Sequence, residues 1–253
     1  MKTFTFYNRK GGSGKTTLLL LLAAYLRYCL GFRVKVVDVQ CPEYPFAFFR
    51  NLDKKNSQRD GSYFSNFLKK RDNRTPYPIE NAGKPVNEYS VKDLREFVWK
   101  INEEVRRDEY DYLLIDFPAL FSKSTPISCL IENHLLDGIY IPFSTDAQES
   151  SDAFILGQNF RSRGLPCRLL WNRIQASYLK EKAEDLDESD RTLASYGLDV
   201  SKVRIKAFNK ATEASDVRCF VRNTLCWPDR YVKMVCPELI PLFDEIVEFL
   251  DKD

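Results

Sequence analysis

The stretch that most constrains the fold is Lys10-Gly11-Gly12-Ser13-Gly14-Lys15-Thr16-Thr17. An alternating apolar run over residues 3–7 precedes it and a leucine-rich run over 18–26 follows it, which is the order strand, glycine-rich loop, helix. Glycines let the backbone curl so that successive N–H groups point into one concavity, and the start of the helix adds the positive end of its dipole. This order predicts a loop that binds the phosphates of a nucleotide.

The side chains of this loop have separate expected tasks. Lys15 is expected to reach the outer phosphates, and the Thr16 hydroxyl to bind a phosphate-bound Mg²⁺. The strict P-loop pattern has a glycine where this chain has Arg9, and the chain carries a second lysine, Lys10. A dinucleotide fingerprint is excluded because Thr17 replaces its last glycine. A glycine turn with chance lysines is the alternative. The residues expected to contact nucleotide are Gly11, Gly12, Ser13, Gly14, Lys15, Thr16 and Thr17.

Composition limits the class of protein without naming a partner. At 253 residues the chain can bury one full α/β core, and a net charge of +2 excludes no partner. Seven cysteines without a Cys-x-x-Cys pair, and His134 as the single histidine, leave no zinc set and suggest reduced thiols in a cytoplasmic protein. The leucine-rich run is too short to span a bilayer, so we expect no export signal and no membrane span.

Alternating strand and helix patterns predict a doubly wound, mostly parallel α/β sheet with helices on both faces. Residues 50–89 are polar and weakly periodic, and we interpret them as a long excursion with one short helix near 63–70. Without an internal repeat or linker, we expect one domain over 1–253. The expected strands are 3–7, 32–38, 110–116, 138–142 and 167–171, and the expected helices are 15–30, 91–105, 127–136, 153–163, 180–196 and 239–250.

Polar residues follow three of these strands, at the edge where an open parallel sheet binds its ligand. Asp116 ends one strand, and a carboxylate suits Mg²⁺ because this hard ion prefers oxygen ligands. Asp38 and Gln40 end another, and Asn172 follows a third. Asp or Asn after a strand is also a common turn residue, and that alternative stays open.

The loop with its extra lysine resembles the deviant Walker A motif of ParA/MinD-type P-loop ATPases, nearest the ParA-like (Soj-like) partition ATPases of plasmids and conjugative elements. The resemblance implies ATP and Mg²⁺ as cofactors, and a homodimer around ATP in which Lys10 contacts the partner's phosphates. It also implies Mg²⁺ binding by Thr16, Asp38 and Asp116, with Asn172 at the adenine.

At position 40 the chain departs from that family, whose second aspartate orients or activates the attacking water. Gln40 can orient a water but offers no general base. We therefore predict an ATPase whose hydrolysis is slow or depends on a partner, with Lys10, Lys15, Asp38 and Gln40 as its catalytic residues.

Residues 202–233 are rich in basic and aromatic side chains. In ParA-like proteins the corresponding part binds DNA without sequence preference, and such binding falls with salt. A plain solvated surface is the alternative. The candidates are Arg204, Lys206, Lys210, Arg218 and Arg222, of which Arg222 lies in a segment, 221–225, that resembles one in ParA-like proteins of mobile elements.

The resemblance further implies a ParB-like partner that triggers hydrolysis, and nucleoid association when ATP is bound. We expect no membrane binding, because the last helix carries Asp244, Glu245 and Glu248 on its polar face and anionic lipid would repel them. Two alternative functions stay open: a nucleotide-binding regulatory module with little hydrolysis, and a small-molecule P-loop enzyme similar to dethiobiotin synthetase.

Overall fold

The computed structural model describes residues 1–51, 76–119, 125–207 and 239–251. The expected helix near 63–70 and the basic candidates Lys210, Arg218 and Arg222 lie outside these ranges. In the described part, seven strands form one sheet in the order β3-β2-β4-β1-β5-β6-β7, and every pair is parallel. The predicted α/β fold class is confirmed.

The elements alternate along the chain as expected. The strands are β1 (Lys2–Phe6), β2 (Val34–Asp38), β3 (Ile79–Asn81), β4 (Tyr112–Asp116), β5 (Gly138–Phe143), β6 (Cys167–Trp171) and β7 (Asp199–Val200). The helices are α1 (Lys15–Ala24), α4 (Val91–Arg107), α5 (Pro126–Glu132), α6 (Ala147–Ser162), α7 (Ala176–Glu181), α8 (Ala183–Ser195) and α11 (Ile240–Leu250). A π-helical turn, Tyr25–Cys29, extends α1, a 3₁₀ turn, Val86–Glu88, precedes α4, and residues 45–51 are helical.

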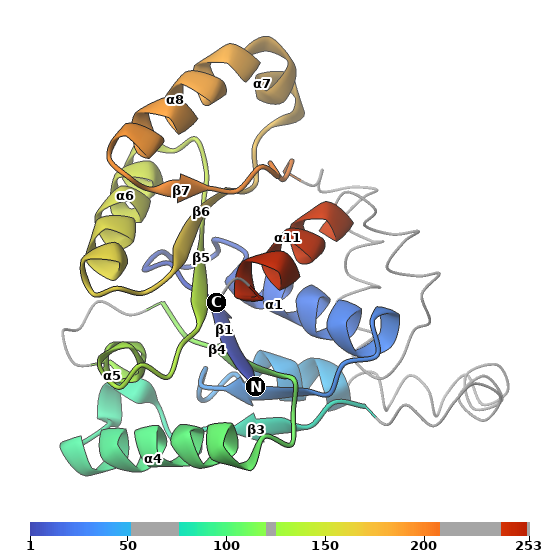
Figure 1. Ribbon diagram of the computed structural model, residues 1–253, viewed down its shortest axis with the longest axis vertical. Helices are drawn as coiled ribbons and strands as arrows, with labels where there is room; N and C mark the ends of the chain where they lie inside the picture. Colours follow the sequence, from blue (N-terminus) through green and yellow to red (C-terminus); the bar gives the residue numbers. More distant parts are fainter. Residues whose placement is uncertain (52–75, 120–124, 208–238, 252–253) are drawn as a thin grey trace, which may run out of the picture.

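Two layers of helices cover the sheet (Figure 1). Helices α1 and α11 lie on one face, and α4, α5 and α6 lie on the other. Side chains alternate between the faces with the period of two that a strand imposes, so Leu114 joins the α1 side while Leu113 and Ile115 join the α4 side. Both faces are apolar, which explains why the sequences of β4 and β5 are continuously hydrophobic.

Several expected boundaries were wrong. The excursion contains β3, which pairs with β2 through backbone groups that no hydrophobic run marks. Helix α6 begins six residues before the expected start, because Asp146 caps it by accepting a hydrogen bond from the Glu149 amide at 2.9 Å. The charged helix expected over 180–196 is interrupted at Lys182, where the backbone leaves the helical region.

The closing helix packs as predicted. Leu242, Phe243, Ile246 and Leu250 of α11 are buried against the α1 face of the sheet. Two of its acidic residues bond back to the protein, since Tyr25 donates to Asp244 and Arg168 pairs with Glu245 at 3.1 Å. No helix within the described ranges is long and apolar enough to cross a membrane.

Candidate nucleotide-binding site

The glycine-rich loop follows β1, which is the central strand of the sheet and lies between β4 and β5. Asn8, at the start of the loop, is fully buried. Its side-chain amide donates to the carbonyl of Pro142 at 2.7 Å, and its side-chain oxygen accepts from the Lys10 amide at 2.9 Å. Asn8 therefore fixes the entry of the loop to β5.

Gly14 joins the loop to α1 in a conformation that only glycine adopts without strain. Its φ is +88°, and the Leu18 amide donates to its carbonyl at 2.9 Å. A Cβ at this position would lie 2.7 Å from Nδ2 of Asn172. That amide of Asn172 donates to the Ser13 carbonyl at 2.8 Å, so the residue after β6 fastens the loop from the other side.

Lys15 lies inside the loop rather than in solvent. It is 6% exposed, and its Nζ donates to the Lys10 carbonyl at 3.0 Å and to the Ser13 hydroxyl at 3.4 Å. Burial lowers the pKa of Lys15 to about 8, although Asp116 opposes this shift. An anion in the loop would favour the charged lysine and satisfy it.

The start of α1 suits an anion. Gly14 provides no capping side chain, and the first turn of α1 contains no acidic residue. The first N–H groups of a helix have no partner within the helix, and its dipole is positive at this end. With Lys15 beside them, these groups suit the binding of a phosphate.

Three polar side chains meet beside this turn, at the ends of β2 and β4. Thr16 donates to Asp116 Oδ1 at 3.2 Å. Nε2 of Gln40 donates to the Thr16 hydroxyl oxygen at 2.5 Å and to Asp116 Oδ2 at 2.5 Å. Parallel pairing sets Asp38 opposite Asp116, so two buried carboxyl groups share this edge of the sheet.

Burial raises the pKa of both aspartates. That of Asp38 rises to about 6 even though the Gln40 and Phe46 amides donate to its oxygens at 3.1 and 3.0 Å. That of Asp116 rises to about 8 through burial and the nearby Asp38. A divalent cation would reverse these shifts.

The hydroxyl of Thr16 and the carboxylate of Asp116 fit Mg²⁺, which takes a few oxygen ligands from protein and others from phosphate and water. Both oxygens of Asp38 are used on the loop after β2. Its expected role as a metal ligand stays a prediction.

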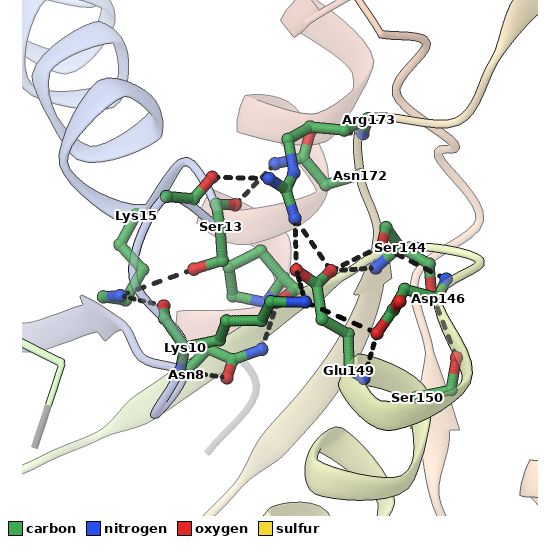
Figure 2. A network of polar contacts seen from close by, with 12 residues as sticks. Asn8, Lys10, Ser13, Lys15, Ser144, Asp146, Glu149, Ser150, Asn172 and Arg173 are labelled. Atoms are coloured by element: carbon green, nitrogen blue, oxygen red, sulfur yellow. Dashed lines mark hydrogen bonds and ion pairs between the residues drawn. The ribbon is translucent and has the colours of Figure 1, made fainter.

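Lys10 lies on the outer side of the loop in a network that Figure 2 shows. Its Nζ is 3.1 Å from Glu149 Oε1 and 3.4 Å from Asp146 Oδ1, both near the start of α6. Arg173 pairs with the same Glu149 at 2.5 Å and donates to the Gly12 carbonyl at 2.7 Å. Glu149 is 1% exposed, so one buried carboxylate connects the loop, α6 and the turn after β6.

The structure thus brings the predicted loop residues together with Asp38, Gln40, Asp116 and Asn172. Asn172 contacts the loop through its side-chain amide. Its recognition of adenine stays a prediction. Sequence reasoning missed the roles of Asn8, Glu149 and Arg173. The one available signal, an Asp and a Glu three residues apart at 146 and 149, is that of a helix cap.

Two of the basic candidates, Arg204 and Lys206, lie within the described residues. Arg204 pairs with Asp187 at 2.6 Å and with Asp190 at 2.5 Å. Lys206 forms a parallel bridge with Ile174 through its backbone. The expectation that either binds DNA stays a prediction.

The fold and the loop define a class of protein: a P-loop nucleotide-binding α/β domain. The profile of the CobQ/CobB/MinD/ParA nucleotide-binding domain family matches residues 4–198, so the chain belongs to that family. Among curated proteins, no sequence matches it.

Solved structures share the fold at low sequence identity. The MinC:MinD cell division protein complex of Aquifex aeolicus has a TM-score of 0.65 and 16% identity, with 98% of this chain and 96% of that chain covered. MinD of Pyrococcus horikoshii OT3 complexed with Mg-ADP has a TM-score of 0.58 and 17% identity, with 100% and 99% covered. A putative plasmid partition protein of Borrelia burgdorferi B31 bound to AMPPNP has a TM-score of 0.56 and 17% identity, with 96% and 99% covered.

Proposed function

We propose that this protein is an ATP-dependent switch that dimerises around ATP and Mg²⁺, binds DNA without sequence preference, and acts in the partitioning of a plasmid, chromosome or mobile element. A ParB-like partner would stimulate hydrolysis and release the dimer. The family match and the nucleotide-bound relatives support the nucleotide, and the plasmid partition relative supports the role in partitioning.

The observation that carries this proposal is the different placement of the two lysines of the loop. Lys15 is buried and directed to the Lys10 carbonyl and the Ser13 hydroxyl of the loop, where it serves the phosphates of its own subunit. The Lys10 side chain is 41% exposed on the outer side of the loop. A lysine at this place would contribute little to binding the phosphates that Lys15 contacts. It suits contact with the phosphates bound by a facing subunit.

A second candidate function, a nucleotide-binding module with little hydrolysis, is favoured by Gln40. Its amide donates to Thr16 and Asp116 and carries no proton-accepting group suited to activating water. Both candidate functions include nucleotide binding, and they differ in the rate of ATP hydrolysis.

The test measures molar mass by light scattering with ATP, ADP and no nucleotide, using the wild type and Lys10→Ala. Lys92→Ala is the control, since Lys92 is an 85% exposed lysine of α4. We expect ATP to double the mass of the wild type and the control only, while Lys10→Ala binds ATP as a monomer. DNA binding should appear with ATP and decline with salt.

A wild-type protein that binds ATP but stays monomeric and ignores DNA would contradict the switch. ATP consumption that requires a small acceptor would replace it with the small-molecule enzyme. An ATP-dependent dimer without DNA-stimulated turnover would support the second candidate.

A further inference from the structure

We propose that the Gln40 side chain occupies the cation position between Thr16 and Asp116 and must move away before a divalent cation can join these two residues. This inference rests on the proposed binding of nucleotide with Mg²⁺. It concerns the residue after β2 whose side chain contacts both Thr16 and Asp116.

The geometry places the amide nitrogen between the two groups that suit the cation. Nε2 of Gln40 is 2.5 Å from the Thr16 hydroxyl oxygen and 2.5 Å from Asp116 Oδ2, and that hydroxyl donates to Asp116 Oδ1 at 3.2 Å. A primary amide has two donor hydrogens, and here each has an acceptor. The positive end of the amide dipole therefore lies between the Thr16 hydroxyl oxygen and Asp116 Oδ2.

The charge of residue 40 decides whether it bridges or repels. An aspartate at this position would set a second carboxylate against Asp116, and like charges disfavour each other at short range. The neutral amide of Gln40 instead donates to Asp116. A cation and the positive end of this amide cannot favour the same spot, so binding of the cation and the Gln40 bridge exclude each other.

The backbone around Gln40 is anchored, so the movement is one of the side chain. Its N–H donates to Asp38 Oδ1 at 3.1 Å, and its carbonyl accepts from the Tyr44 amide at 2.7 Å. The other oxygen of Asp38 accepts from the Phe46 amide at 3.0 Å. The half-buried side chain of Gln40 can leave by rotation about its own bonds while the loop after β2 stays in place.

The experiment uses ADP, which lets the site be measured without hydrolysis. The dissociation constant of ADP is determined by calorimetry in EDTA and in saturating Mg²⁺ for the wild type and Gln40→Ala. The ratio of the two constants is the factor by which Mg²⁺ tightens binding. Gln158→Ala is the control, because Gln158 also donates a side-chain amide hydrogen bond, to the Tyr196 carbonyl at 3.0 Å.

We expect the Mg²⁺ factor to be about tenfold larger in Gln40→Ala than in the wild type, since two hydrogen bonds no longer compete with the cation. The constants in EDTA should agree within about twofold, and Gln158→Ala should match the wild type. A shift of the half-saturating Mg²⁺ concentration to lower values in Gln40→Ala provides the second readout.

Equal Mg²⁺ factors in the wild type and Gln40→Ala would overturn the inference while leaving the proposed function intact. If ADP binds as expected but ATP produces no dimer, the proposed switch fails and the Gln40 bridge stands. If no form of the protein binds ADP, both are overturned.

Discussion

At the scale of single residues, Glu149 is a buried carboxylate with several charged and polar donors around it. It is nearly inaccessible, yet it accepts hydrogen bonds from Arg173, Ser144 and Lys10. Burial alone would raise its pKa, but these partners outweigh burial and lower the pKa from 4.5 to about 2. A carboxyl group with a depressed pKa stabilises the fold above its unfolded pKa and loses that effect as pH falls toward the folded value.

Glu149→Gln is therefore expected to reduce the free energy of unfolding at pH 7 by about 2 kcal/mol, because a neutral amide replaces charge-assisted bonds. The difference between wild type and variant should shrink between pH 4.5 and about 2, where the wild-type carboxylate gains its proton. Urea unfolding across this range measures it. Glu132→Gln, at a 65% exposed carboxylate 3.9 Å from Arg163, should show almost no difference. A Glu149→Gln difference that does not change with pH would contradict the role of the charge.

Single residues also show what sequence could and could not predict about the site. The glycines, Lys15 and Thr16 were predictable because their tasks depend on neighbours within a few residues. The contacts of Gln40 and Glu149 join positions 76 and 24 residues apart, and only the folded sheet brings those positions together. The residue type at positions 40 and 149 limits which hydrogen bonds the side chain can make. The tertiary structure determines which residue it bonds to.

At the scale of elements, the strands and helices with strong apolar patterns lie where the sequence predicted them. The strands that were missed are β3 and β7, of three and two residues, whose pairing depends on a neighbour already in the sheet. Helix α6 was placed too late because its first turn is polar and faces the site rather than the core. The apolar pattern thus predicts the elements that form the core, and it is weak for short edge strands and for a helix start that borders the site.

Helix α11 is the element whose role was most open to a different reading, since an amphipathic last helix can bind membranes. Phe243 is fully buried, with its ring centre 5.4 Å from that of Tyr25 on the helical segment after α1. Phe243→Ala should therefore cost about 3–5 kcal/mol of unfolding free energy. Glu248→Ala, on the exposed side of α11, should cost less than about 0.5 kcal/mol.

Urea unfolding compares the two variants, and sedimentation with anionic vesicles provides the second measurement. We expect the wild type to remain in the supernatant, because its apolar face is already covered by the core. Wild-type stability in Phe243→Ala, together with vesicle binding that this variant loses, would assign α11 to a membrane surface instead.

At the scale of the whole molecule, the proposed switch needs a surface that reaches DNA when two subunits meet. The net charge of +2 is too small to attract DNA by itself, so local basic residues must supply the binding. Among the candidates that the structure describes, Arg204 is 22% exposed and its charge is already offset by Asp187 and Asp190. This pairing indicates that Arg204 connects α8 to the segment that follows β7. Arg222 is therefore the stronger candidate for phosphate contact.

Arg222→Ala should therefore weaken DNA binding by the ATP-bound protein, and Arg204→Ala should not. Each lost phosphate contact lowers the slope of log affinity against log salt concentration by about 0.9, hence by about 1.8 for a dimer that loses two. Fluorescence anisotropy with labelled duplex across a salt series measures this slope, and Lys92→Ala controls for the loss of one exposed positive charge. If Arg204→Ala flattens the slope as much as Arg222→Ala does, its guanidinium must leave both aspartates to bind DNA. The DNA-binding surface would then extend to the end of the sheet that carries β7.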